Sequence, residues 1–404
     1  MKVLIAMDSF KGSLSSLDAG EAVRTGLHRA IPNAEAVVRP LADGGEGTVD
    51  ALIAGLGGRT RTVTVSGPLA EEGQTVKASY GILPDHITAV MEMSSAAGLT
   101  LVPPDRRNPL LTTTRGVGEL IADAIQHGCR RFLIGIGGSA TNDGGIGMLQ
   151  ALGYGMLDRN GRQVSCGAKG LKELEAISDS GVLPALQDCR FQIACDVTNP
   201  LCGSNGASAI FGPQKGASPA MIARMDAWLA HYAALSRRSY PRADDAAPGS
   251  GAAGGLGFAF LTYTHAVLRS GVDMILEETG LAREVESADL VVTGEGRLDS
   301  QTAMGKAPIG VAKLAKQVHK PVIAFAGCVT EDAGLLNRSG IDAFFPILRS
   351  AVPLSEAMEP DRARANLSAA AEQVFRLWNV AQKNEIHSGI DDTAGIKAEK
   401  GMKA

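Results

Sequence analysis

Short β-branched apolar runs, each followed by glycine-rich polar residues and a helical stretch, recur along the chain. They cover residues 3–7, 131–136, 191–195, 289–292 and 321–325. The stretch 15–31 shows the helical part: Val23 and Leu27 fall at helical spacing, and Ser15 with Asp18 forms a variant of the capping box. Strands that alternate with helices predict a mostly parallel α/β sheet.

The segment 59–93 departs from this pattern. It holds three extended runs, at 60–65, 75–82 and 88–93, which predict an antiparallel meander. Strand, loop and helix patterns return after about residue 285. We therefore expect a discontinuous first domain from residues 1–60 plus 285–381, with residues 61–284 inserted as a mixed-sheet α/β domain.

Two segments lack a regular pattern. Residues 236–257 are polar and then rich in glycine, which is typical of a linker or a mobile loop. Residues 384–404 are polar and lose helical period, which predicts a disordered tail.

Composition and charge exclude several classes of protein. The formal net charge is −4 and aromatic residues are 4%, so neither a basic face nor a stacking platform for nucleic acid is expected. No apolar run approaches the length of about 18 residues that a membrane span needs. The first apolar run, 3–7, is too short for a signal peptide, and the six scattered cysteines form no C-x-x-C pair. We expect a cytoplasmic protein with reduced thiols.

One glycine-rich loop follows the second of the apolar runs. The sequence GGSATNDGG, at 137–145, places small residues and hydroxyls between a strand and a helix, which suits a phosphate cradle. Its candidate ligands are Gly137, Gly138, Ser139, Thr141 and Asp143. A plain packing turn is the alternative, and the glycine spacing does not match the dinucleotide-binding fingerprint.

Two lysines stand in turns that could meet an anion. Lys11, in DSFKGS at 8–13, could neutralise a phosphate or carboxylate beside backbone N–H groups at a helix start. Lys215, in FGPQKG at 211–216, could seat a base or a carboxylate. Each segment could equally be an ordinary turn.

Acidic residues gather at the ends of predicted strands. Asp43 and Glu46, in DGGEGT at 43–48, could hold a metal or a ligand, or belong to a tight turn. Asp196 could be a general base, an Mg²⁺ ligand or a helix cap. The sequence GEGRLD, at 294–299, concentrates more charge than a simple loop needs: Glu295, Arg297 and Asp299.

Several familiar catalytic motifs are absent. Gly305-Lys306 is not a P-loop, because Ser300 stands where the first glycine is required and Ala307 where Ser or Thr is required. The chain also lacks the eukaryotic kinase motifs, the His-Glu-x-x-His zinc motif and the Gly-x-Ser-x-Gly elbow of hydrolases.

Taken together, five ordered motifs resemble the type I glycerate kinase family of bacteria. They are DSFKG (8–12), DGGEGT (43–48), GGSATNDGG (137–145), DVTNPL (196–201) and GEGRLD (294–299). The resemblance implies ATP- and Mg²⁺-dependent phosphorylation of D-glycerate, with 2-phosphoglycerate favoured over the 3-phosphate, in glyoxylate or sugar-acid catabolism. It also implies a flavodoxin-like parallel-sheet domain with an inserted, smaller mixed-sheet α/β domain, and an active site in the cleft between them.

On this resemblance we assign roles to the candidates. The catalytic set is Asp196, Lys11, Glu295 and Arg297, with Asp196 the preferred base and Glu295 the next. The nucleotide set is Gly137, Gly138, Ser139, Thr141, Asp143 and Lys215, and the Mg²⁺ set is Asp43, Glu46 and Asp299. The expected partner is D-glycerate, with no nucleic acid or membrane, and a homo-oligomer is left open. The alternatives are an NAD-dependent hydroxy-acid oxidoreductase, which lacks its fingerprint here, and a non-catalytic ligand-binding α/β protein, which leaves the acids unexplained.

Overall fold

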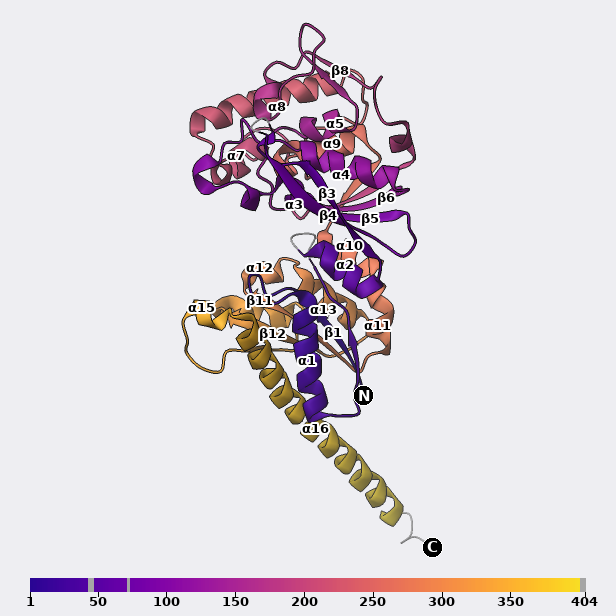
Figure 1. Cartoon of the computed structure of the whole chain (residues 1–404). Coiled ribbons are helices and arrows are strands. Elements are labelled where there is room, and N and C mark those ends of the chain that lie inside the picture. Colours follow the sequence, from indigo (N-terminus) through magenta and orange to yellow (C-terminus); the bar gives the residue numbers. More distant parts are fainter. Residues whose placement is uncertain (43–46, 71–72, 400–404) are drawn as a thin grey trace. The chain divides into compact units, whose positions relative to one another are not determined.

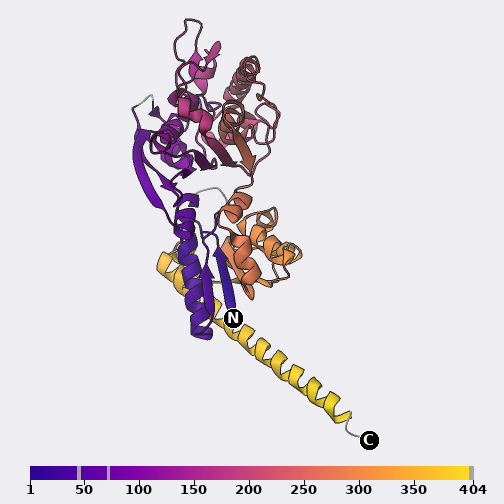
Figure 2. The same cartoon turned by 90° about the vertical axis from the view of Figure 1, so that its right-hand side faces the viewer.

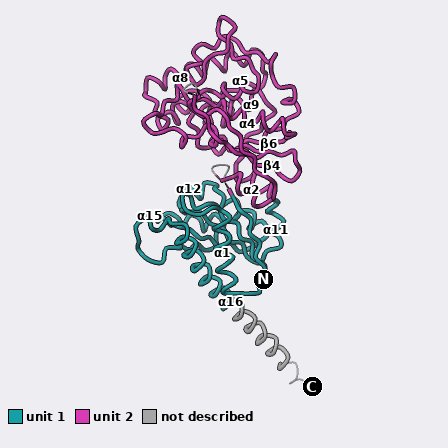
Figure 3. Tube along the Cα trace, in the orientation of Figure 1, with its two compact units in different colours: residues 1–41, 280–404 teal, residues 42–279 magenta. Residues whose placement is uncertain are grey.

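Two compact units make up the chain (Figure 3). The computed structural model describes residues 1–42, 47–70 and 73–399 of the 404. Residues 1–41 with 280–404 form unit 1, and residues 42–279 form unit 2. The sequence predicted these divisions near residues 60 and 285, whereas contacts in the structure divide the chain after residues 41 and 279. Unit 2, with the mixed sheet, is the longer of the two rather than the smaller.

Unit 1 is built on a parallel sheet. Its strands are β1 (Lys2–Met7), β2 (Glu35–Val38), β11 (Leu290–Leu298), β12 (Val322–Val329) and β13 (Ala343–Pro346). They are ordered β13-β12-β11-β1-β2, and every neighbouring pair is parallel. Counted along this unit alone, the order is 2-1-3-4-5, which is that of flavodoxin-like sheets. The predicted flavodoxin-like domain is confirmed.

Helices cover both faces of this sheet (Figure 2). The helices α1 (Ser16–Ala30) and α16 (Pro360–Glu399) lie side by side on one face, and α11 (Leu281–Ser287) and α13 (Ala307–Gln317) lie on the other. The Ser15 side chain accepts the N–H of Asp18 at 3.1 Å, as the predicted cap requires. Gly26 lets α1 approach α16 closely, because a Cβ there would lie 2.3 Å from the carbonyl oxygen of Ser368.

Helix α16 extends into the segment for which the sequence predicted disorder. It is helical to Glu399, and residues 400–404 lie outside the described part of the chain. The predicted disordered tail at 384–404 therefore stays a prediction.

Unit 2 is built on a mixed sheet. Its strands are β3 (Arg59–Ser66), β4 (Thr75–Ile82), β5 (Thr88–Glu92), β6 (Arg131–Gly135), β9 (Arg190–Ala194) and β10 (Ala266–Arg269). They are ordered β10-β9-β6-β5-β4-β3. The strands β3, β4 and β5 pair antiparallel, which confirms the predicted meander, and the remaining neighbours pair parallel.

Alternate residues of these strands supply cores on opposite faces. Phe132 and Phe191 stack with ring centroids 4.7 Å apart in the larger core. This core is covered by α4 (Arg115–Gln126), α5 (Ile146–Ala151), α8 (Pro219–Ser236) and α9 (Ala252–Tyr263). The neighbouring Leu133 and Val90 face the smaller core with α2 (Thr48–Leu56) and α10 (Gly271–Glu278), as Figure 1 labels them.

Short elements complete the two units. In unit 2 they are β7 (Gly155–Leu157), β8 (Ala176–Ser178), α3 (Ser94–Ala97), α6 (Ala168–Leu171), α7 (Ala207–Phe211), η2 (Leu99–Leu101), η3 (Pro104–Arg106), η4 (Pro184–Asp188) and η5 (Pro213–Lys215). In unit 1 they are α12 (Ser300–Ala303), α14 (Leu335–Arg338), α15 (Leu354–Ala357) and η6 (Glu331–Gly334). Over the described residues, no helix combines the length and the apolar character that crossing a membrane demands.

The glycine-rich end of segment 236–257 is a buried structure and not a linker or mobile loop. Its backbone turns through positive φ at Ala253, Gly254 and Gly255 as it enters α9. A Cβ on Gly254 would lie 2.1 Å from the carbonyl oxygen of Thr141, and one on Gly255 would lie 2.8 Å from the Cα of Gly144. Glycine is needed here because two backbones pack directly on each other. The prediction was wrong because composition alone does not separate close packing from mobility.

Candidate functional site

The predicted residues of unit 1 meet where β1 and β11 lie side by side. In a sheet of this order, the point between these strands is where ligands bind, beyond the carboxyl ends. The N–H of Asp8 donates to the carbonyl of Gly294 at 2.9 Å, which ties the end of β1 to β11. A Cβ on Gly296 would lie 3.4 Å from the Cα of Phe10, so the loop with the exposed Lys11 runs directly against β11.

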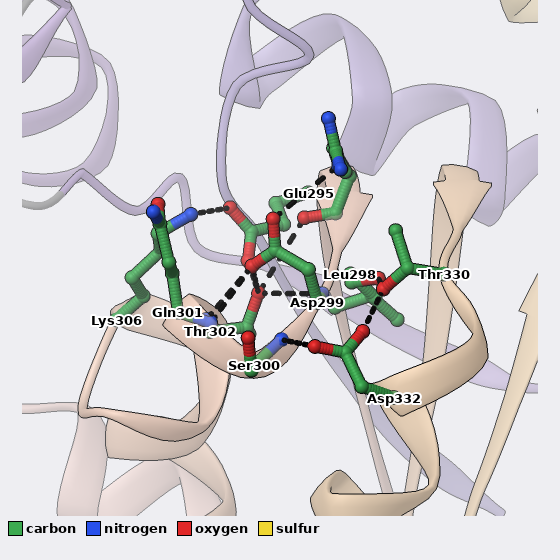
Figure 4. Close-up of polar contacts among 10 residues, drawn as sticks. Glu295, Leu298, Asp299, Ser300, Gln301, Thr302, Lys306, Thr330 and Asp332 are labelled. Atoms are coloured by element: carbon green, nitrogen blue, oxygen red, sulfur yellow. Dashed lines mark hydrogen bonds and ion pairs between the residues drawn. The ribbon is translucent and has the colours of Figure 1, made fainter.

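Glu295 is a buried carboxylate in β11, with only 7% of the residue exposed. Its Oε1 accepts the Thr302 hydroxyl at 2.6 Å, and its Oε2 lies 3.5 Å from the Lys306 ammonium (Figure 4). Burial raises the pKa of Glu295 above its ordinary value, against the opposing effects of Thr302 and Lys306. A carboxyl group in this setting is held in one orientation and is readier to keep a proton than a surface glutamate.

Asp299 and Arg297 are partners at the start of α12. The Oδ1 of Asp299 accepts the N–H groups of Gln301 at 3.0 Å and Thr302 at 3.2 Å, and Thr302 completes a capping box (Figure 4). The other oxygen of Asp299 lies 3.3 Å from Nε of Arg297, whose side chain is 65% exposed. The sequence predicted Asp299 as an Mg²⁺ ligand, and the structure shows its carboxylate engaged as a helix cap.

The described residues offer no preformed metal cluster. Asp43 and Glu46, the other predicted Mg²⁺ ligands, lie outside the described residues. Elsewhere in the described chain, no three His, Cys, Asp or Glu side chains come together in a way that would hold a metal ion.

The glycine-rich loop 137–145 of unit 2 is exposed at its start and buried at its end. Gly137 and Gly138 are exposed, Ser139 is nearly buried, and Thr141 and Asp143 are fully buried. The backbone N–H of Ala140 donates to the carbonyl of Ala97 at 2.9 Å. The exposed glycines are therefore the part of the predicted cradle that a phosphate can reach.

Asp143 anchors this loop from within unit 2. One oxygen accepts the N–H of Thr114 at 2.8 Å and the hydroxyls of Thr114 at 3.0 Å and Thr113 at 3.3 Å, and the other accepts the N–H of Gly145 at 3.1 Å. Burial raises its pKa, whereas these hydrogen bonds act to lower it. Our sequence reasoning missed the threonines, although the run TTT at 112–114 just before a helix was the available signal.

Lys215 supports the same loop from η5. It is 1% exposed, and its Nζ donates to the carbonyl of Thr141 at 2.6 Å. Burial lowers its pKa from the ordinary 10.5 to about 7, against the opposing charge of Asp143. The structure thus joins Thr141, Asp143 and Lys215 as internal supports of the loop, and their predicted contact with a nucleotide stays a prediction.

The depressed pKa of Lys215 predicts how stability changes with pH. Above about pH 7 the folded chain releases this proton, whereas the unfolded chain holds it up to about 10.5. The free energy of unfolding should therefore rise with pH in this window, by up to about 1.4 kcal/mol per pH unit. Urea titrations from pH 6 to pH 9, comparing the wild type with Lys215→Met, isolate the contribution of this lysine. Parallel pH curves for the two proteins would contradict it.

Asp196 follows β9 and lies against the start of α10. Its side chain is exposed, and its Oδ1 accepts the N–H of Gly271, the first residue of α10, at 3.1 Å. The helix also has its own cap, because the Ser270 hydroxyl accepts the N–H of Asp273 at 3.5 Å. The carboxylate is therefore fixed in direction while remaining accessible to solvent.

The similarity to known proteins extends over nearly the whole chain and is not confined to one motif. The model of the glycerate kinase family matches residues 3–379. The chain is 47% identical to a glycerate 2-kinase of Escherichia coli strain K12, over 95% of this chain and 100% of the relative. It is 49% identical to a glycerate kinase of Bacillus subtilis strain 168, over 89% and 93%. The crystal structure of a proposed glycerate kinase 2 from Salmonella typhimurium LT2 superposes with a TM-score of 0.87 at 45% identity, covering 95% of this chain and 99% of that one.

Proposed function

The chain belongs to the glycerate kinase family, and on that premise we propose that it transfers the terminal phosphoryl group of ATP to D-glycerate, giving 2-phosphoglycerate. The observation that carries the proposal is the family match over residues 3–379. The rival interpretations, an NAD-dependent oxidoreductase and a non-catalytic binding protein, find no support in these matches. An enzyme that uses ATP on a small organic acid fits the cytoplasm, where both are available.

Positioning and neutralisation of charge are the main demands of phosphoryl transfer. We propose that phosphate oxygens meet the exposed backbone of Gly137 and Gly138, because N–H groups in such a glycine-rich turn attract anions. Thr141, Asp143 and Lys215 then keep the loop in shape from inside unit 2. This divides the predicted nucleotide set into residues that contact the ligand and residues that support the loop.

The attacking hydroxyl of glycerate has to lose its proton. We propose Asp196 as the acceptor, since its carboxylate is exposed and is held by the N–H of Gly271. Glu295 is the second candidate, because burial favours its protonated form while its contacts with Thr302 and Lys306 hold it at a fixed position.

The carboxylate and phosphate charges need cationic partners. Lys11 and Arg297 both carry exposed cations on unit 1, and Arg297 is steadied by Asp299 at 3.3 Å. We propose that these cations bind the glycerate carboxylate or the transferring phosphate. Mg²⁺ bound to the nucleotide would supply further neutralisation.

The activity is tested directly with the purified protein. We expect ATP consumption that requires both D-glycerate and Mg²⁺, and a phosphorus NMR spectrum of the product that matches 2-phosphoglycerate. Chelation of the metal should stop the reaction. A folded protein that leaves ATP intact but reduces NAD with a hydroxy acid would overturn the proposal.

A further inference from the structure

Arg107 contacts the turn that carries Lys215, although no sequence motif singled it out. Gly216 packs on it at φ +90°: a Cβ there would be 2.3 Å from the carbonyl oxygen of Arg107 and 3.2 Å from its Cβ. The residue before Gly216 is Lys215, whose Nζ binds the carbonyl of Thr141. Arg107 therefore contacts the residue next to Lys215, and Lys215 in turn binds the glycine-rich loop.

The segment that follows Arg107 also contacts this loop. The hydroxyl of Thr112 donates to the carbonyl of Ala140 at 2.8 Å, and Thr113 and Thr114 bind Asp143. The backbone from 112 to 114 is thus fixed to the loop, and Arg107 lies five residues before it.

The Nε of Arg107 lacks a hydrogen-bond partner within the described residues. This nitrogen is inaccessible to solvent and donates to no acceptor there. Partly buried arginines elsewhere are paired: Arg61 with Asp123 at 2.6 Å, and Arg39 with Glu284 at 2.8 Å. A buried donor without an acceptor is costly, so a nitrogen in this state calls for a partner that accepts its hydrogen bond.

The chemistry of the missing partner follows from the donor. A guanidinium is planar, permanently charged and suited to hold two oxygens of a carboxylate or phosphate at once. In the same neighbourhood, the buried Oγ1 of Thr141 also lacks a partner among the described residues. We propose that Arg107 binds an oxyanion of the reactants, either the carboxylate of the hydroxy acid or a phosphate of the nucleotide. The inference rests on the proposed function, which supplies both oxyanions.

Kinetics of three variants test this role. Arg107→Met keeps the apolar stem and removes the charge, Arg107→Lys keeps the charge without the planar fork, and Arg159→Met is a matched control at an exposed turn. With Arg107→Met, the KM for D-glycerate or for ATP should rise about 10- to 100-fold, and the KM that rises identifies the oxyanion. Arg107→Lys should recover part of the loss, and the control should behave as the wild type.

Binding measurements separate this inference from the activity itself. Calorimetric titrations of wild type and Arg107→Met with ATP, and separately with D-glycerate, need no turnover. If the wild type is inactive, the proposed function fails, and these titrations still decide the role of Arg107. Weaker binding of one ligand supports the role. Unchanged KM values and unchanged binding of both ligands would overturn it, and a lowered melting temperature alone would show that Arg107 only packs.

Discussion

Asp196→Asn should lower kcat by about 10²–10⁴-fold, the usual contribution of a positioned general base. The Oδ1 of Asp196 accepts the N–H of Gly271 at 3.1 Å. Asparagine keeps an Oδ1 that can accept the same N–H, so the side chain should stay in place. Folding and the KM for D-glycerate should therefore change little, while proton transfer is lost. The measurement is kcat across an Mg²⁺ titration, with thermal melting of the same samples.

Asp226→Asn is a matched control for this substitution. Asp226 is also an aspartate of unit 2 whose Oδ1 accepts a glycine N–H, that of Gly203 at 2.9 Å. It should keep wild-type kcat. If the Asp196→Asn defect disappears at high Mg²⁺, Asp196 is a metal ligand rather than the base. If Asp196→Asn keeps the wild-type kcat and loses a little stability, Asp196 acts only as a helix cap. Glu295→Gln would then become the variant to test.

The strands were predictable because their apolar runs are short, β-branched and bounded by glycine. The runs 3–7 and 289–292 correspond to β1 and the start of β11. The order of the strands within each sheet could not be predicted from these runs. The return of strand and helix patterns after about residue 285 placed both ends of the chain in one domain, but it did not predict that β1 pairs with β11, because a hydrophobic pattern records burial and not neighbours.

Local sequence pointed to the candidate residues, both exposed and buried, but not to the contacts that hold the buried ones. An acid after a strand, such as Asp196, can be read from local sequence, because the end of the strand defines its place. The supports cannot, since they are long-range: Asp143 is held by Thr114, 29 residues away, and Lys215 reaches Thr141 over 74. A threonine run looks like any polar turn until the fold brings a buried carboxylate to it.

Asp143→Ala should be among the most destabilising single substitutions in unit 2, because Asp143 is the acceptor for four buried donor groups. Removing it leaves the N–H groups of Thr114 and Gly145 and two hydroxyls without their acceptor in a place that water does not reach. It also removes the negative charge that favours the ammonium of Lys215. Loss of a buried charged acceptor costs on the order of 3–5 kcal/mol in the free energy of unfolding.

The measurement can be confined to unit 2, because the tryptophans are divided between the units. Trp228 packs in the core of unit 2, and Trp378 packs in that of unit 1. In a Trp378→Phe background, urea unfolding followed by tryptophan fluorescence therefore reports unit 2. Asp158→Ala is the control, since Asp158 also accepts two backbone N–H groups, at 2.8 and 2.9 Å, but from an exposed turn. A much larger loss for Asp143→Ala than for Asp158→Ala is expected, because only the former leaves donors in a dry interior. Equal losses would mean that Asp143 is no more than a local turn residue, and that the loop keeps its shape by glycine packing alone.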